Sequence, residues 1–181
     1  MLKKLHHVAY RCKDAQETVD FYTKALGLKY SMALSGERVP STRERCPHLH
    51  IFFEMEDGSN IAFFELSEAP GMQLDPNTPN WVQHLALEVA DEAAMAAARK
   101  RLERHGVNVI GPIDHAFCQS IYFFDPSGHR LELTYRTETP EMMQKLADVA
   151  DPMLEAWNRT KQHVPLADWV HPHSAPAKPQ A

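Results

Sequence analysis

The sequence has few cysteines, and they do not form a framework. The three cysteines, Cys12, Cys46 and Cys118, lie far apart without any C-x-x-C spacing. A disulfide scaffold needs an even number of cysteines at close spacing, and a zinc ribbon needs paired thiolates. The sequence therefore excludes both, and its cysteine content favours the reducing cytoplasm.

Long apolar runs and an excess of positive charge are also lacking. No segment approaches the roughly 18 apolar residues of a membrane span, and the N-terminus, MLKKLHHVAY, lacks the apolar core of a signal peptide. Acidic side chains outnumber basic ones by 24 to 19, for a formal charge of -5, and no Lys/Arg-rich stripe is present. We expect a cytoplasmic protein with neither a nucleic-acid nor a membrane partner.

The composition that remains is that of a globular domain. Apolar residues make up 44% and charged residues 24% of the 181 residues, which is ordinary for a folded protein. This length suffices for one domain with a core, or for two small fused modules.

An internal repeat organises the chain. Residues 5–14 read LHHVAYRCKD and residues 82–91 read VQHLALEVAD, so that His7 and His84 correspond at an offset of 77 residues. Self-similarity at a fixed offset indicates two copies of one structural unit. The short apolar alternation of both stretches is typical of a strand.

Each of these strands is followed by the signals of a helix. In the first copy Asp14 and Glu17 have the spacing of a capping box, and Gly27 ends the helical stripe. In the second copy Asp91 leads through an alanine-rich stretch to Gly106. Two strand-helix units therefore recur.

Strand-like segments follow each helix and complete a β-α-β-β-β unit. Turns at residues 57–58 and 125–128 separate them. They comprise residues 28–34 and 48–66 in the first copy, and residues 107–110 and 119–135 in the second.

We predict an α+β fold in which two tandem βαβββ modules form a cupped, barrel-like mixed sheet, because pairing two modules covers their open edges. A helical extension follows, with an amphipathic helix over residues 141–158 that Pro152 interrupts. The expected boundaries are 1–66 and 81–136 for the two modules, 67–80 for a proline-rich linker, 137–169 for the extension and 170–181 for a flexible tail.

Three side chains could hold one divalent metal. His7 and His84 occupy matching places on their strands, and Glu132 lies on a last strand that we expect to face the same cup. Two neutral imidazoles and one carboxylate are the set that leaves positions open, most typically on Fe(II). A lone histidine in a strand is usually structural, and His6, whose side chain should point to the other face, is interpreted so.

Glu65 has three interpretations. By its repeat position it is a possible fourth ligand, but it could instead pair with one of three nearby arginines or line the cup without binding anything. Those arginines could also meet a substrate carboxylate, although solvated surface charge is the commoner role of such residues. They are Arg38, Arg43 and Arg45.

A second group of residues points to proton transfer. His115 ends a loop and Tyr122 stands on the following strand, before the turn that returns the chain to Glu132. Histidine titrates near neutrality and can move a proton, and a phenol can donate a hydrogen bond to a bound oxygen. If these two residues stood without the nearby carboxylate, they would be interpreted as a loop histidine and a core aromatic.

The sequence resembles the vicinal oxygen chelate superfamily, which includes glyoxalase I, fosfomycin and bleomycin resistance proteins and type I extradiol dioxygenases. The openings LHHVAYRCKDAQETVDFYTKALGLKY and QHLALEV carry the resemblance, which covers about residues 4–136. Residues 113–132, IDHAFCQSIYFFDPSGHRLE, resemble the extradiol ring-cleavage signature. The chain has one module pair, as in the smaller one-domain members.

The resemblance implies an extradiol dioxygenase that cleaves a catechol-type aromatic with O₂. It implies Fe(II), or sometimes Mn(II), on His7, His84 and Glu132. His115 would be the acid/base, and Tyr122 a hydrogen-bond partner of substrate or oxygen. Aromatic side chains could line the pocket for the ring: Phe52, Phe63, Phe117 and Phe124.

Two alternatives stay open. The spacing of Glu65, His84 and Glu132 resembles that of bacterial glyoxalase I, which would imply a lyase or isomerase using Ni(II), Co(II) or Zn(II) for an oxygen-chelating substrate, with Glu65 as fourth ligand. A metal-free drug-binding protein is the other. In each case we expect a homodimer, because open sheet edges and the apolar face of the last helix need covering.

Overall fold

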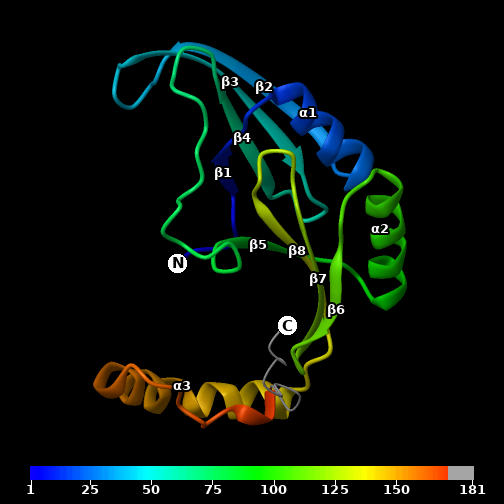
Figure 1. Cartoon of the computed structure of the whole chain (residues 1–181), viewed down its shortest axis with the longest axis vertical. Coiled ribbons are helices and arrows are strands. Elements are labelled where there is room, and N and C mark those ends of the chain that lie inside the picture. Colours follow the sequence, from blue (N-terminus) through cyan, green and yellow to red (C-terminus); the bar gives the residue numbers. More distant parts are fainter. Residues whose placement is uncertain (171–181) are drawn as a thin grey trace, which may run out of the picture. The chain divides into compact units, whose positions relative to one another are not determined.

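The computed structural model describes residues 1–170, so the predicted flexible tail lies outside the described residues except for its first position. The predicted α+β fold is confirmed, with two four-stranded sheets and a C-terminal helix (Figure 1). The chain divides into two compact units. The first comprises residues 1–85, 96–109 and 123–131, and the second comprises residues 86–95, 110–122 and those from 132 onward.

The first sheet contains β1 to β4 in the order β1-β4-β3-β2. β1 pairs with β4 in parallel, and the other pairs are antiparallel. β1 and β4 can be parallel because a helical crossover follows β1 and returns the chain to the same end of the sheet before β2 begins. Figure 1 shows α1 along one face of the sheet. The strands are β1 His7–Arg11, β2 Lys29–Arg38, β3 Arg45–Glu54 and β4 Asn60–Leu66.

The first helix begins at the predicted N-cap and continues into a π-helical turn that was not predicted. The Asp14 carboxylate accepts a hydrogen bond from the Glu17 amide at 2.8 Å, so α1 (Ala15–Asp20) has the expected N-cap. The chain then widens into a π-helical turn, η1 (Phe21–Ala25). Its last carbonyls, those of residues 25 and 26, accept hydrogen bonds from the Arg101 guanidinium at 2.8 and 2.7 Å.

Tyr22 is the centre of the core in the first unit. Its ring is fully buried and lies 5.0 Å from the ring of Phe53 and 4.8 Å from that of Phe63. Its hydroxyl donates to Asp125 Oδ2 at 3.1 Å. Phe63 is therefore a core residue, and its predicted place in a substrate pocket is wrong.

The second sheet has the order β5-β8-β7-β6. A helix again follows the first strand, and Asp91 again provides the cap by accepting the Ala94 amide at 2.8 Å. Both copies therefore have the predicted β-α-β-β-β order. The elements are β5 His84–Glu88, α2 Glu92–Arg104, β6 Ile110–Asp114, β7 Cys118–Phe124 and β8 Arg130–Arg136.

Gly111 sets the pairing of β6 with β7. The register shifts between Ile110, which faces Tyr122, and Ile113, which faces Ser120. At this irregularity Gly111 has φ +108°, and a Cβ there would lie 2.7 Å from the Ser120 carbonyl oxygen. Only glycine allows this approach without displacement.

The C-terminal extension is one long helix, α3 (Pro140–Thr160). Thr139 caps it by accepting the Met142 amide at 3.2 Å. The predicted interruption at Pro152 is wrong, because the helix continues through this exposed residue, where water can replace the lost backbone hydrogen bond. No side chain of α3 is buried, and a short 3₁₀ turn, Asp168–Val170, follows. Over residues 1–170, no helix is long and apolar enough to span a membrane.

Candidate functional site

His7 lies on the face of the first sheet opposite the face that packs on Tyr22. Directly opposed residues of paired strands share a face, and Phe64, which pairs with His50, alternates with core residue Phe63. The His7 ring contacts this second face, at 6.3 Å from the His50 ring and 5.8 Å from that of Phe52. Phe52 therefore lies beside His7 but is itself buried, and its predicted place in a pocket stays a prediction.

His50 is a further candidate site residue, and strand alternation places it on the same face as His48. It stacks on Phe64 with ring centroids 3.6 Å apart. Burial lowers the pKa of His50, and the neighbouring His7 and His48 lower it further, so the imidazole is neutral at physiological pH. The alternation of His48 and His50 on β3 was the available signal. His48 is held by a contact of its Nδ1 with the Cys46 carbonyl oxygen at 2.7 Å.

His6 precedes β1 and is exposed. Its Nδ1 lies 2.8 Å from Nδ1 of His7, a distance at which one ring donates and the other accepts. His6 can therefore set the tautomer of His7.

Glu65 makes a contact that its repeat position did not predict. Its Oε2 accepts a hydrogen bond from the Ala15 amide at 2.7 Å, at the start of α1. Negative charge is favoured at this end of a helix, so the contact supports a structural role for Glu65. Arg45, one of its predicted partners, instead contacts Glu37 at 3.2 Å and Glu68 at 2.6 Å on the surface.

His84 is exposed at the start of β5 and lines a pocket within the first unit. The pocket has a volume of about 750 Å³, in the range of small-molecule sites. Its walls include the aromatic rings of Tyr10 and Phe124 and the side chains of His129 and Arg130. The predicted pocket position of Phe124 therefore agrees with its place beside His84.

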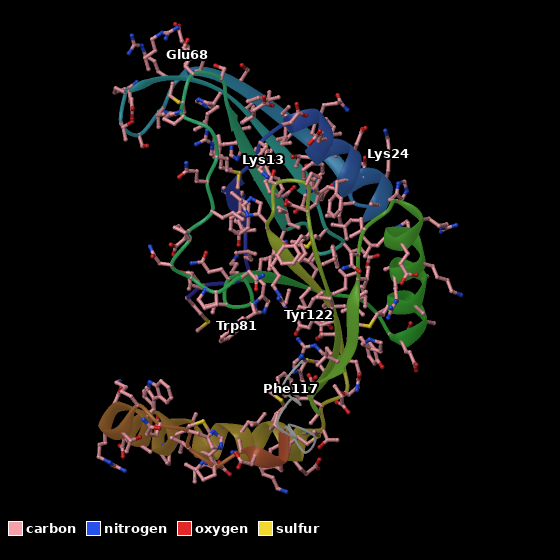
Figure 2. All side chains as sticks on the ribbon, in the orientation of Figure 1. Lys13, Lys24, Glu68, Trp81, Phe117 and Tyr122 are labelled. Carbon is pink, nitrogen blue, oxygen red and sulfur yellow. The ribbon has the colours of Figure 1, made fainter. Side chains whose placement is uncertain are left out.

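His115 and Tyr122 are in direct contact in the second unit. His115 Nε2 lies 2.8 Å from the Tyr122 hydroxyl, and the rings meet edge to face. The loop is fixed by the Asp114 carboxylate, which accepts the Ala116 amide at 2.7 Å, and by the His115 amide, which donates to the Cys118 carbonyl at 2.9 Å. Figure 2 labels Tyr122 on β7 and Phe117 in the preceding loop.

Glu132 lies in the same unit and connects to this pair. Only 6% of the residue is exposed, and its Oε1 accepts a hydrogen bond from the hydroxyl of fully buried Ser120. Burial raises the pKa of Tyr122, and the negative charge of Glu132 raises it further. Tyr122 therefore keeps its proton at neutral pH and can donate it in a hydrogen bond. Sequence analysis predicted Tyr122 and Glu132 as site residues but missed Ser120.

The chemistry of these donors suits a divalent metal. His7 and His84 are exposed imidazoles, and Glu132 is a buried carboxylate already held by a hydroxyl. Within either unit, over residues 1–170, no three His, Cys, Asp or Glu side chains form a group that could hold a metal. A site of His7, His84 and Glu132 would draw on both units, and it stays a prediction.

Comparison with known proteins identifies relatives that include a ring-cleaving dioxygenase and a lyase. The chain is 29% identical over 133 residues to MhqA of Bacillus subtilis (strain 168), a protein assigned to the ring-cleaving dioxygenases. That match covers 72% of this chain but 39% of MhqA, so the chain spans about two fifths of that relative. It is also 30% identical over 144 residues to lactoylglutathione lyase of Escherichia coli O157:H7, covering 72% of this chain and 90% of the lyase.

Solved structures share the fold. A glyoxylase/bleomycin resistance protein/dioxygenase domain from Frankia sp. EAN1pec superposes with a TM-score of 0.62 at 17% identity, over 75% of this chain and 99% of the other. The fosfomycin resistance protein FosX from Listeria monocytogenes, in complex with Mn(II), superposes with a TM-score of 0.56 at 22% identity, over 80% of this chain and all of FosX. The family model for the Glyoxalase/Bleomycin resistance protein/Dioxygenase superfamily matches residues 4–133. Because this match covers more than half of the chain, the protein belongs to that superfamily.

Proposed function

We propose that the protein is a metal-dependent dioxygenase that cleaves a catechol-type aromatic ring with O₂. The observation that carries this proposal is the His115–Tyr122 hydrogen bond of 2.8 Å in contact with the buried Glu132. A histidine and a protonated phenol next to a ligand carboxylate provide the acid/base group and the hydrogen-bond donor that ring opening requires. The similarity to a ring-cleaving dioxygenase supports the same reaction.

The proposed metal ligands are His7, His84 and Glu132, and the proposed metal is Fe(II), with Mn(II) as the second choice. Such a metal supplies open positions at which a diol chelates and O₂ is activated. Strand alternation supports two members of the set, His84 and Glu132. Glu88 shares the alternation of His84 on β5 and forms an ion pair at 3.0 Å with Arg136, which shares the alternation of Glu132 on β8.

The proposed roles of the remaining residues follow from their contacts. His115 moves a proton between substrate and product, and Tyr122 orients it while donating a hydrogen bond to a substrate oxygen. His50, neutral and next to His7, provides a second base on that face of the first sheet. The pocket beside His84 has the size and the aromatic walls to hold a small aromatic ring.

We further propose that two copies of the chain form a homodimer through α3. The helix has one broad apolar face, on which Met143, Leu154 and Trp157 are between 45% and 58% exposed. An apolar face of this kind on an otherwise polar helix is typical of a protein interface.

A lyase or isomerase that uses Ni(II), Co(II) or Zn(II) is the second candidate. The 30% identity to lactoylglutathione lyase favours it, and it would employ Glu65 as a fourth ligand. The hydrogen bond from the Ala15 amide to Glu65 gives that carboxylate another role. For this reason the dioxygenase is preferred.

Two variants in the same assays separate the candidates. Protein loaded anaerobically with Fe(II) should consume O₂ with at least one of a panel of catechols. His115→Ala should retain metal but lose about 10²- to 10⁴-fold in rate, the usual contribution of general acid/base catalysis. Glu65→Gln should retain metal because the residue is not a ligand.

The opposite pattern identifies the lyase. Loss of metal in Glu65→Gln, full activity in His115→Ala and turnover only in a lactoylglutathione lyase assay with Ni(II), Co(II) or Zn(II) would refute the dioxygenase. Tyr30→Phe, on an exposed side chain, serves as the matched control in both assays.

A further inference from the structure

Glu132 is a buried carboxylate whose orientation is set by a neighbouring hydroxyl. Ser120 Oγ donates to Glu132 Oε1, and Ser120 itself is fully buried. A carboxylate removed from water needs hydrogen-bond donors, and a hydroxyl next to a charged oxygen makes a stronger bond than it does to a neutral one. The Ser120 proton is therefore directed at Glu132.

The Ser120 hydroxyl is itself held from two sides. Thr134 Oγ1 lies 3.2 Å away, and Cys118 Sγ lies 3.8 Å away. Thr134 Oγ1 can also donate to the Gln119 carbonyl oxygen at 3.2 Å. A hydroxyl has one proton and two lone pairs, so Ser120 can accept from the Cys118 thiol while it donates to Glu132, and the Thr134 proton goes to the Gln119 carbonyl oxygen. These contacts fix the rotation of a side chain that would otherwise turn freely.

We propose that Ser120 is a positioning residue that holds Oε1 of Glu132, so that the carboxylate would bind a metal through one oxygen. The proposal rests on the proposed function, in which Glu132 is a metal ligand. Coordination through one oxygen occupies one metal position, whereas coordination through both would occupy two. By holding Oε1, Ser120 would keep one more metal position open for the substrate.

The register of β7 explains why the sequence places a serine here. Ser120 and Tyr122 alternate onto the same face, and both contact Glu132. Ser120 acts on the carboxylate and Tyr122 connects it to His115. A hydroxyl two residues before the tyrosine is therefore placed to reach Glu132.

The test measures metal binding rather than turnover. The full chain is stripped of metal and titrated with Co(II) against a competing chelator, and the visible spectrum of the Co(II) protein reports coordination number. Ser120→Ala should weaken Co(II) binding about 10- to 100-fold, as for other residues that orient metal ligands. Its absorption should also weaken if Glu132 turns to bind through both oxygens. Ser120→Thr, which keeps the hydroxyl, should restore affinity and spectrum.

Controls separate this role from a structural one. Thr18→Val removes another fully buried hydroxyl, one that donates to the Asp14 carbonyl at 2.6 Å, and should leave Co(II) affinity and spectrum unchanged even if it lowers the unfolding temperature. If Ser120→Ala does not fold, Ser120→Cys, which keeps the shape but is a weak donor, carries the same expectation.

The outcomes distinguish the two proposals. If Ser120→Ala binds Co(II) as tightly as the wild type and with the same spectrum, while Glu132→Gln loses the metal, the metal site stands and the role of Ser120 is refuted. If Glu132→Gln binds as tightly as the wild type, or the wild type binds none, the proposed function fails and the role of Ser120 fails with it.

Discussion

Replacing Tyr22 with phenylalanine tests the polar contact at the centre of the first unit. The substitution removes only the hydroxyl that donates to Asp125 Oδ2 at 3.1 Å, and the ring contacts with Phe53 and Phe63 remain. Burial raises the pKa of Tyr22 well above its ordinary value, so the hydroxyl keeps its proton and can donate at neutral and acidic pH. The effect of the change therefore measures this one hydrogen bond.

Its magnitude follows from the burial of the acceptor. Asp125 is 5% exposed and also accepts the His129 amide at 2.8 Å. Removing a donor from a charged, buried acceptor costs about 1.5–3 kcal/mol, and removing it from a neutral one about 0.5–1.5 kcal/mol. At neutral pH, Tyr22→Phe should therefore lower the free energy of unfolding by roughly 2 kcal/mol.

The loss should depend on pH in a defined direction. Burial raises the pKa of Asp125, and the Tyr22 hydrogen bond opposes that rise, so the variant has a still higher folded-state pKa. A raised folded-state pKa means that the folded protein binds the proton more tightly than the unfolded chain. The bound proton of Asp125 therefore stabilises the folded protein below the pKa of Asp125 in the unfolded chain, and this stabilisation is lost as pH rises through its pKa in the folded protein. Tyr22→Phe loses more of this stabilisation than the wild type does, so the difference between their free energies of unfolding grows with pH.

Urea denaturation at neutral pH and near the ordinary aspartate pKa of 3.8 measures both effects. In thermal unfolding at neutral pH the melting temperature should fall by about 4–8 °C, since 1 kcal/mol corresponds to roughly 2–4 °C for a chain of this size. Tyr30→Phe, at a residue 42% exposed, should change stability by less than about 0.5 kcal/mol. Equal deficits at both pH values, or none at neutral pH, would refute the argument.

Two further predictions concern the second unit. Gly111→Ala should lower the free energy of unfolding by about 1–3 kcal/mol, because the new Cβ would lie 2.7 Å from the Ser120 carbonyl oxygen. Gly71→Ala is the control, because a Cβ at Gly71 would have no atom within 4 Å. Equal melting temperatures for the two variants would contradict the close approach at Gly111. Light scattering at micromolar concentration should show that the wild type is a dimer. Leu154→Lys should be a monomer, because it places a charge on the exposed apolar face of α3. A monomeric wild type would exclude the proposed interface.

Local signals in the sequence predicted the order of elements correctly. The two aspartates that follow β1 and β5 were expected to cap helices, and both accept the amide three residues on. Cap chemistry acts over a few residues, so it is visible in a sequence without knowledge of the tertiary structure. The β-α-β-β-β order of both copies followed from the same local patterns.

Features that depend on distant contacts were not predicted. The π-helical turn of η1 ends where Arg101, about 75 residues later, donates to its carbonyls. The continuity of α3 through Pro152 depends on the exposure of that residue. The place of Phe63 depends on its contact with Tyr22. Each of these outcomes is decided by packing or solvent access, for which a linear pattern has no signal.

The two Glu-Leu pairs show why repeat position predicts a residue's place but not its use. Glu65 and Glu132 each lie on the last strand of a copy, and the sequence offered both as metal ligands. Glu65 accepts the amide of Ala15, so its charge is used at the start of a helix. Glu132 accepts the hydroxyl of Ser120 and raises the pKa of Tyr122, so its charge is used beside an acid/base pair. The use of a carboxylate therefore depends on the donors around it, and these come from distant parts of the fold for Glu65 and from the neighbouring strand for Glu132.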